Sequence, residues 1–375
     1  MSEPDIRKAT WLELFYDLAY VAVIAKVVHH LPEYTDHLSH YFASLAIFIP
    51  IWWCWAGHTY FANRFERNDT IQVVSVLAQL FAVVVLITAI NPLFEGDPQP
   101  FILGYFIIRL LLIVMYAREW KVNTDSKPIL RNLTFGFSLG ALVWISSLLF
   151  ESTILYALLA LSILIEIIVL ALNSKSLQTF TATHAEHLAE RTGLLTIIML
   201  GEVIVALVVF LEHAGLTVEN LALAASGFTI LSLMWWLYFR VSEPLIEDNP
   251  ILDSQIHGYS NLLIFISIIV ISTAIASWGV KEEHTIVWLT ASALALFVGT
   301  LQLILGKSPI YDDRLGINII RYVYCLVPLI IAAVFHQLGL SVLAFNSLIV
   351  IWFFIVNYTQ NFTYTFTHNF KVSLK

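Results

Sequence analysis

Charged residues are scarce in this chain. Only 12% of its 375 residues are Asp, Glu, Lys or Arg, whereas soluble domains carry about 25%. Hydrophobic residues make up 59%, and the mean hydropathy is +0.81. This composition excludes an ordinary soluble domain and indicates a polytopic membrane protein. The formal net charge of -8 says little by itself, because membrane proteins sort their charges by side of the membrane rather than by sum. Nucleic-acid binding has no support in the sequence, so we expect no nucleic-acid partner.

Cysteine is nearly absent as well. Cys54 and Cys325 both lie inside apolar runs and lack the spacing of a disulfide framework or a zinc site. No Walker A sequence occurs, which argues against ATP-driven transport by this chain alone. We expect no cofactor. The first apolar run is too long and too charged for a cleaved signal peptide, so we expect it to be retained as a helix.

Long apolar runs separated by short polar breaks fill the rest of the chain. A transmembrane helix needs about 20 predominantly apolar residues. The predicted spans cover residues 11–31, 40–62, 71–91, 100–119, 132–150, 154–172, 190–211, 218–239, 259–278, 285–305, 317–336 and 340–358. The sequence therefore predicts an all-α polytopic membrane protein with about 12 transmembrane helices.

Lys and Arg are distributed unevenly between the two sides of these spans. When the loops are assigned to alternating sides, fifteen of the 19 basic residues fall on the side of the N-terminus, and Lys281 alone falls opposite. The other three, Lys26, Arg109 and Arg321, lie within predicted helices. Because cytoplasmic loops carry the excess of Lys and Arg, we expect both termini in the cytoplasm.

The two halves of the chain also resemble each other in sequence. Displacing residues 12–28 by 176 positions sets Lys26 against Glu202. Each half then holds an even number of spans, which predicts two parallel six-helix repeats related by an axis along the membrane normal. The predicted division is a cytoplasmic N-terminus at 1–10, a first half at 11–172, a cytoplasmic linker at 173–189, a second half at 190–358 and a cytoplasmic tail at 359–375.

Several ionisable residues fall within the predicted spans, where a central charge costs about 2.5 to 3.5 kcal/mol on insertion scales. Arg109 has no acid in its own helix, and Glu166 or Glu202 is nearest to it in depth. Lys26 is expected to pair with Glu202, either as a structural ion pair between the halves or as part of a pathway. The candidate binding or translocation residues are Lys26, Arg109, Glu166 and Glu202.

A second group of polar residues is predicted at the cytoplasmic rim. Glu13 and Asp17 are four residues apart and share one helical face. They are expected at the level of FANRFERND (61–69) and THAEHLAER (183–191), where the second and seventh spans meet the cytoplasmic side. These segments are expected to be the partners of the two carboxylates.

A histidine-rich set lies in the second of these segments. His184, His187 and Glu190 are spaced i, i+3 and i+6, so they would share a helical face. Such a set could bind a metal, relay protons, or only cap the helix and form salt bridges. Two His and one carboxylate are an incomplete set of metal ligands.

Five segments resemble the bacterial low temperature requirement protein A (LtrA) family and occur in the same order: WLELFYDLAYVAVIA, FANRFE, LGYFIIRLLL, HAEHLAERTGLLTIIMLGEVIVAL and WWLYF. The resemblance extends from residue 11 to about 280. It implies a multi-pass protein of the bacterial inner membrane, but no particular chemistry. The sequence departs from the family pattern at Lys26, where a neutral polar residue is expected, and at Arg240, where an acid is usual.

The resemblance also implies which positions matter. Those carried over by matching motif are Glu13, Asp17, Asn63, Arg64, Arg109, His187, Glu190, Arg191, Glu202 and Tyr238. All but Arg109 and Glu202 form the predicted cytoplasmic-side polar cluster, which thus comprises Glu13, Asp17, Asn63, Arg64, His187, Glu190, Arg191 and Tyr238.

Three functions are compatible with these features. We favour a secondary transporter of a small polar or ionic solute, with proton coupling through Glu202, the acids of the first span or the rim histidines. The alternative is an ion channel built from two six-helix repeats. The segment LFYDLAY faintly resembles the first-helix motif of a lysosomal and bacterial potassium channel family, but no TVGYG-like filter is present.

The third function is an intramembrane enzyme with a His/Glu site at the cytoplasmic face. No nucleophile motif accompanies that site, so enzymatic activity is the less favoured reading. The expected partners are membrane lipid and a small solute. A homodimer is compatible with a lipid-embedded bundle but has no specific signal in the sequence.

Overall fold

The computed structural model describes residues 9–65, 67, 69–181, 184–248, 253–305 and 315–373. Within these ranges, the side chains of residues 38, 242–248, 253–258, 305, 315–322 and 360–373 are not described. Every regular element in the described ranges is a helix. The all-α prediction is therefore confirmed.

The helices belong to two compact units. The first unit consists of Met1–Val27 and Ala43–Arg191, and the second of Val28–Phe42 and Thr192–Lys375. Helix α9 (Ala185–Ala214) contributes its first two turns to the first unit and the remainder to the second. The predicted site residues His187, Glu190 and Arg191 of α9 precede Thr192 and therefore belong to the first unit.

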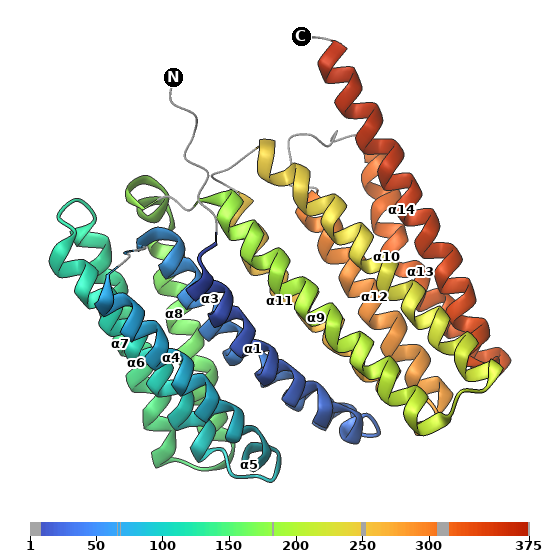
Figure 1. Cartoon of the computed structure of the whole chain (residues 1–375), viewed down its shortest axis with the longest axis horizontal. Helices are drawn as coiled ribbons and strands as arrows, with labels where there is room; N and C mark the ends of the chain where they lie inside the picture. Colours follow the sequence, from blue (N-terminus) through green and yellow to red (C-terminus); the bar gives the residue numbers. More distant parts are fainter. Residues whose placement is uncertain are drawn as a thin grey trace. The chain divides into compact units, whose positions relative to one another are not determined.

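Helix α6 is at the centre of the first unit. It packs against α3, α4 and α7, and α7 packs in turn against α8, so that α6, α7 and α8 run next to one another (Figure 1). The helices of this unit are α1 (Trp11–His30), whose last three residues belong to the second unit, α3 (Phe48–Phe65), α4 (Thr70–Thr88), α5 (Ile90–Phe94), α6 (Gln99–Val122), α7 (Lys127–Ser146) and α8 (Ser152–Phe180), with the 3-10 turn η2 (Ser147–Leu149) before α8.

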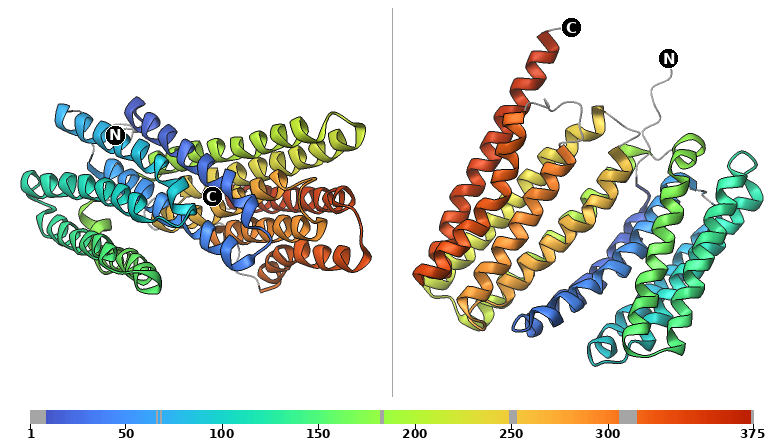
Figure 2. Two further views of the ribbon diagram at one scale, coloured as in Figure 1. Left: turned by 90° about the horizontal axis from the view of Figure 1, so that it is seen from below. Right: turned by 180° about the vertical axis from the view of Figure 1, so that it is seen from behind.

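The second unit is a bundle in which successive helices are neighbours. Helix α11 packs against α12 and α12 against α13, while α14 packs against α10 and α13 (Figure 2). Its elements are η1 (Leu31–Tyr34), α10 (Val218–Asp248), α11 (Asp253–Ala276), α12 (Glu283–Leu305), α13 (Leu315–Leu338) and α14 (Val342–Ser373); α2 (Leu38–Ala46) begins here and ends in the first unit.

Local sequence signals account for several helix ends. Thr10 and Glu13 form a capping box at the start of α1, and Asp69 caps α4 by accepting from the backbone N–H of Gln72 at 2.9 Å. Gly215 and Gly339 follow α9 and α13 directly with φ of 84° and 61°. This is the left-handed conformation that commonly ends a helix and that glycine adopts without strain.

Two of the predicted spans are interrupted, and proline explains both interruptions. The predicted span 40–62 is split at Ile47 into α2 and α3, and the span 71–91 contains a turn at Ala89 between α4 and the short α5, within the apolar stretch Thr70–Phe94. Pro50 and Pro92 lie in the first turn of α3 and α5, where they cannot donate to the carbonyl four residues earlier.

Nine helices among the described residues are long and apolar enough to span a membrane. They are Thr70–Phe94, Gln99–Val122, Lys127–Leu149, Ser152–Phe180, Ala185–Ala214, Val218–Val241, Tyr259–Ala276, Glu283–Ile304 and Val342–Thr359. The chain is therefore a polytopic membrane protein. The other three predicted spans correspond to α1, which carries three charged residues, to the interrupted α3, and to α13, whose described apolar part, Val323–Leu338, is shorter.

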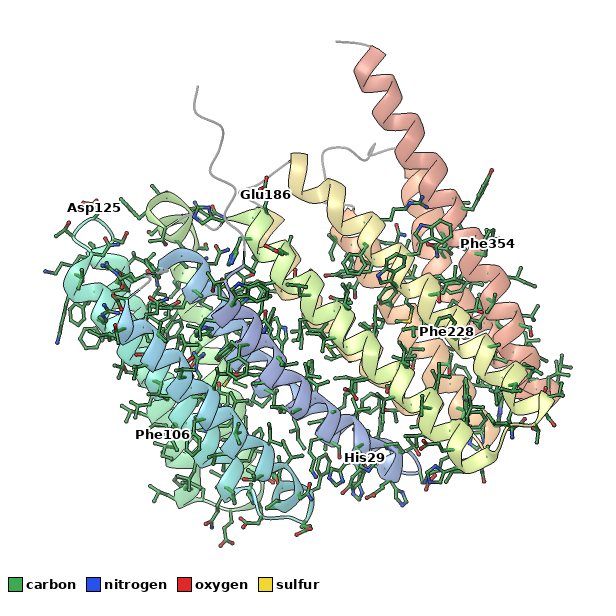
Figure 3. The ribbon with its side chains drawn as sticks, viewed as in Figure 1. His29, Phe106, Asp125, Glu186, Phe228 and Phe354 are labelled. Carbon is green, nitrogen blue, oxygen red and sulfur yellow. The ribbon has the colours of Figure 1, made fainter. Side chains whose placement is uncertain are left out.

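Large apolar side chains cover the outside of these helices. Phe228 on α10 and Phe354 on α14 are more than half exposed and point away from their helices (Figure 3). Exposed apolar side chains are also frequent on α4 and α8, for example Phe81 and Leu172. Because the chain is embedded in a membrane, this surface contacts lipid.

Gly227 of α10 provides a test of the packing in the second unit. A Cβ atom on Gly227 would lie 2.6 Å from Cη2 of Trp278 and 3.1 Å from Cδ2 of Leu207. Because the indole ring is large and rigid, we expect Gly227→Ala to destabilise the protein by about 1–3 kcal/mol. Gly201→Ala is the matched control, since a Cβ there meets no atom within 4 Å. Thermal unfolding in detergent measures both, and equal melting temperatures would contradict the packing.

Candidate functional site

Arg109 of α6 and Glu166 of α8 form an ion pair in the interior of the first unit. Nη2 of Arg109 donates to Oε2 of Glu166, and the two side chains are 2% and 0% exposed. The same carboxylate oxygen accepts a hydrogen bond from the indole N–H of Trp53 at 2.5 Å. Of the two partners that the sequence left open for Arg109, the structure selects Glu166. An isolated buried charge is far more costly than a pair, which explains how α6 accommodates an arginine.

This ion pair is incompletely hydrogen-bonded. Nε and Nη1 of Arg109 and Oε1 of Glu166 are buried and have no hydrogen-bond partner in the described part of the protein. The buried hydroxyl of Tyr105 is in the same situation. Buried polar atoms normally have partners, and each one left without costs about 1–3 kcal/mol. Within the described residues, the pair therefore carries unused donors and an unused acceptor in the protein interior.

Two glycines let neighbouring helices close on the pair. A Cβ on Gly57 of α3 would lie 2.6 Å from Nη1 of Arg109, and a Cβ on Gly140 of α7 would lie 3.1 Å from Oε1 of Glu166. Ser162 of α8 donates to the carbonyl of Gly140 at 2.8 Å, which holds α7 and α8 together at this level. The ion pair thus fills space that a side chain at either glycine would occupy.

A second buried cluster is built around Asp17 of α1. Nε of Arg191 donates to Oδ2 of Asp17 at 3.1 Å, and Nη2 donates to Oδ1, so the guanidinium binds the carboxylate in a bidentate manner. The indole N–H of Trp55 donates to Oδ1 at 2.7 Å. Asp17 and Arg191 are 1% and 0% exposed. This pair joins α1, α3 and the first two turns of α9.

Glu13 lies one helical turn before Asp17, and its charge is stabilised by the beginning of its own helix. Its Oε2 accepts from the backbone N–H and the hydroxyl of Thr10 at 2.9 and 3.0 Å. A carboxylate is favoured at a helix N-terminus, where the backbone dipoles present positive charge. Nε2 of His187 is 3.1 Å from the same oxygen, and Nη1 of Arg191 is 3.7 Å from Oε1.

Asn63 of α3 ties His187 and the start of α9 to this cluster. Its side-chain amide contacts Nδ1 of His187 at 2.8 Å and both backbone groups of His184. His184 is exposed and precedes the first residue of α9, so the expected common helical face of His184, His187 and Glu190 does not form. Among the described residues, no three His, Cys, Asp or Glu side chains are grouped as metal ligands.

Helix α3 connects the two clusters. Trp53 and Trp55 are two residues apart on this helix and donate to Glu166 and Asp17, respectively. The role of these tryptophans as hydrogen-bond donors was not predicted from the sequence. Residues separated by two positions face different sides of a helix, so the spacing in WWCW could have indicated two separate partners.

Aromatic side chains extend the buried polar region of the first unit. The hydroxyls of Tyr16 and Tyr20 are 3.2 Å apart, and the ring of Tyr16 stacks on His58 with the centroids 3.9 Å apart. All three side chains are almost fully buried. Sequence reasoning missed these residues because tyrosine and histidine within an apolar run look like ordinary packing residues.

The remaining predicted site residues have separate environments. Nε of Arg64 donates to the carbonyl of Thr181 at 3.1 Å, and the exposed Glu190 accepts from the backbone N–H of Ala9 at 3.0 Å. Tyr238 is in the second unit, where its hydroxyl donates to Asn261 at 2.9 Å.

Lys26 and Glu202 belong to different units. Lys26 is half-buried in the α1 part of the first unit, and Glu202 is half-buried in the α9 part of the second. Their pairing stays a prediction. The side chain of the third intramembrane cation, Arg321, lies outside the described residues.

Charges at the rim of the first unit form a separate network. Arg67 binds Glu119 through Nε and Nη2 at 2.6 and 3.0 Å, and Arg118 binds Asp69. The hydrogen bonds from Arg118 and from the backbone of Gln72 lower the pKa of Asp69 below its ordinary value. In Figure 3, Asp125 in the turn after α6 and Glu186 in the first turn of α9 lie at the same end of this unit. Arg67, Arg118 and Asp69 are partly exposed, whereas Glu119 is buried.

The fold and these clusters define an all-α polytopic membrane protein that keeps ionisable groups inside a helical unit. The chain belongs to the bacterial low temperature requirement A protein (LtrA) family, whose model matches residues 8–357. The resemblance noted in the sequence is therefore confirmed. A protein of Rhizobium meliloti (strain 1021) with the name "Uncharacterized protein RA0937" is 24% identical over 258 residues. That match covers 65% of the chain and 61% of the length of the relative.

The ion pair of Arg109 and Glu166 makes a clear prediction about stability. Arg109→Met would leave the Glu166 carboxylate buried without its counter-ion, at a cost of about 3–5 kcal/mol. Adding Glu166→Met removes the second charge, so the double variant should recover most of that loss. Thermal unfolding in one detergent measures the coupling free energy between the two side chains, from the wild type, both single variants and the double variant. Losses that simply add would contradict a direct interaction.

Proposed function

We propose that the chain is a secondary transporter of a small polar or ionic solute and that transport is coupled to protons. The observation that carries this proposal is the burial of the Arg109 ion pair and of the Asp17 cluster within one helical unit of a membrane protein. Glu13, Asp17, Arg109, Glu166, His187 and Arg191 are each 5% exposed or less. Intramembrane charges of this kind mark ion and proton pathways in transporters.

The incomplete bonding of the Arg109 pair argues for more than a structural role. A purely structural pair is stabilising only when its geometry is excellent and its remaining polar atoms are satisfied. Here two guanidinium nitrogens and one carboxylate oxygen have no partner in the described residues. Such atoms supply donors and an acceptor for a solute or a proton when the surrounding helices move. The candidate binding and translocation residues remain Lys26, Arg109, Glu166 and Glu202.

We further propose how the chain is arranged in the membrane. The chain crosses the bacterial inner membrane twelve times, with both termini in the cytoplasm, as the distribution of Lys and Arg supports. Two parallel six-helix halves, at 11–172 and 190–358, would be joined by a cytoplasmic linker at 173–189.

Proton-coupled flux through proteoliposomes tests this proposal. The purified protein is reconstituted around a pH-sensitive dye, and small cations, small carboxylates and amino acids are added in turn. We expect at least one class to move protons in a saturable manner that depends on the pH gradient. In the same assay Glu166→Gln should reduce the signal to the level of protein-free liposomes, because it removes the titratable group next to Arg109.

Glu151→Gln provides the matched control. It makes the same chemical change at an exposed residue in the turn before α8 and should leave flux unchanged. Voltage-driven unitary currents in planar bilayers would instead indicate a channel. Saturable flux that survives Glu166→Gln at the wild-type rate would reject the role given to the buried pair.

A further inference from the structure

The contacts of Asn63 determine where the proton of His187 resides. His187 is 1% exposed, and both of its ring nitrogens have a neighbour within hydrogen-bond distance. Nδ1 is 2.8 Å from Nδ2 of Asn63, and Nε2 is 3.1 Å from Oε2 of Glu13. Which nitrogen carries a hydrogen therefore depends on which of these neighbours donates and which accepts.

The orientation of the Asn63 amide is set by the backbone of His184. The N–H of His184 donates to Oδ1 of Asn63 at 2.8 Å, and Nδ2 of Asn63 donates to the carbonyl of His184 at 3.0 Å. Reversing the amide would place two donors against each other and two acceptors against each other. The backbone of His184 thus permits only one orientation, with Nδ2 toward His187.

An amide NH₂ group can donate hydrogen bonds but cannot accept them. Since Nδ2 of Asn63 faces Nδ1 of His187, Nδ1 must offer its lone pair and carry no hydrogen. The single ring hydrogen then resides on Nε2 and is donated to the Glu13 carboxylate. We propose that Asn63 locks His187 as this neutral Nε2–H tautomer and excludes the doubly protonated imidazolium. Asn63 therefore acts as a positioning residue for the carboxylate cluster.

The charges around His187 are compatible with a neutral ring. The charged group in contact with the ring is Glu13 of α1. Arg191, one turn further along the helix of His187, binds Asp17 and lies 3.7 Å from Oε1 of Glu13, while Arg64 of α3 points to the carbonyl of Thr181. The negative charge of Glu13 is stabilised by the capping hydrogen bonds from Thr10 at the start of α1. The cluster does not need an imidazolium to hold two carboxylates.

A proton can reach Nδ1 only if the hydrogen bond from Asn63 breaks. Because the same amide group holds both backbone groups of His184, protonation of His187 opposes the contact that fixes the start of α9. Under the proposed transport function, on which this consequence rests, proton uptake would release the beginning of α9 from α3. The tautomer itself does not depend on that function.

Nitrogen NMR of the whole chain in lipid nanodiscs tests the lock without any solute. The protein is labelled with ¹⁵N at histidine, and His187→Gln identifies the signals of His187 by their loss. We expect a protonated Nε2, which couples to both ring carbon-bound hydrogens, and an unprotonated Nδ1, unchanged between about pH 5 and 8. A hydrogen on Nδ1 within this range, in either neutral or charged form, would overturn the proposal.

Asn63→Asp tests the cause of the lock. A carboxylate at this position offers only acceptors to Nδ1, so Nδ1 should carry a hydrogen as Nε2 does. Asn123→Asp is the matched control, because its oxygen can still accept from the N–H of Ser126, and it should leave His187 neutral. An unprotonated Nδ1 in Asn63→Asp would overturn the role of Asn63. If that variant does not fold, the wild-type spectrum still decides the tautomer.

The two proposals can fail separately. Absence of solute flux with an intact Nε2–H pattern would reject transport and leave the lock standing. Flux together with a hydrogen on Nδ1 of His187 would reject the lock and leave transport standing.

Discussion

The structure of the first unit depends on a single constraint, which is that charges inside a bundle surrounded by lipid must be paired within it. Asp17 meets Arg191, and Glu166 meets Arg109, in each case across two different helices. Removing one member of such a pair leaves an uncompensated charge at a cost of about 3–5 kcal/mol, comparable to a large part of the stability of many proteins. The helices that carry these residues must therefore stay packed together for the charges to remain paired.

Helix α3 serves both pairs. Trp53 and Trp55 each donate to one of the two buried carboxylates, Gly57 allows close approach to a guanidinium, and Asn63 holds the start of α9. These functions follow one another along about three turns of a single helix. A polar and aromatic helix of this kind has low hydropathy, and α3 is accordingly absent from the helices that qualify as spans by composition. The polar and aromatic residues that lower the hydropathy of α3 are the same residues that form the site.

Part of the site was predictable because charge in an apolar run demands a partner. Arg109 lacks an acid in its own helix, and that fact reduced its candidates to two, of which Glu166 is the partner. The placement of Glu13 and Asp17 beside the HAEHLAER segment was expected from their common face. The position of His184 outside α9 was not predictable. The i, i+3, i+6 spacing suggests a helix that includes His184, whereas hydrogen bonds between Asn63 and the backbone of His184 set the actual start of α9 after this residue.

The sequence by itself determined the class of protein, the positions of the long helices and the list of charged residues that had to be paired. These properties follow from composition and from periodicity along the chain, which are local. Only the tertiary structure decided which charges meet, which indoles donate and which polar atoms remain without a partner. Residues 57 positions apart, such as Arg109 and Glu166, are brought together by helix packing. Nothing in the local sequence specifies the rotation of one helix against another, and that rotation decides which side chains touch.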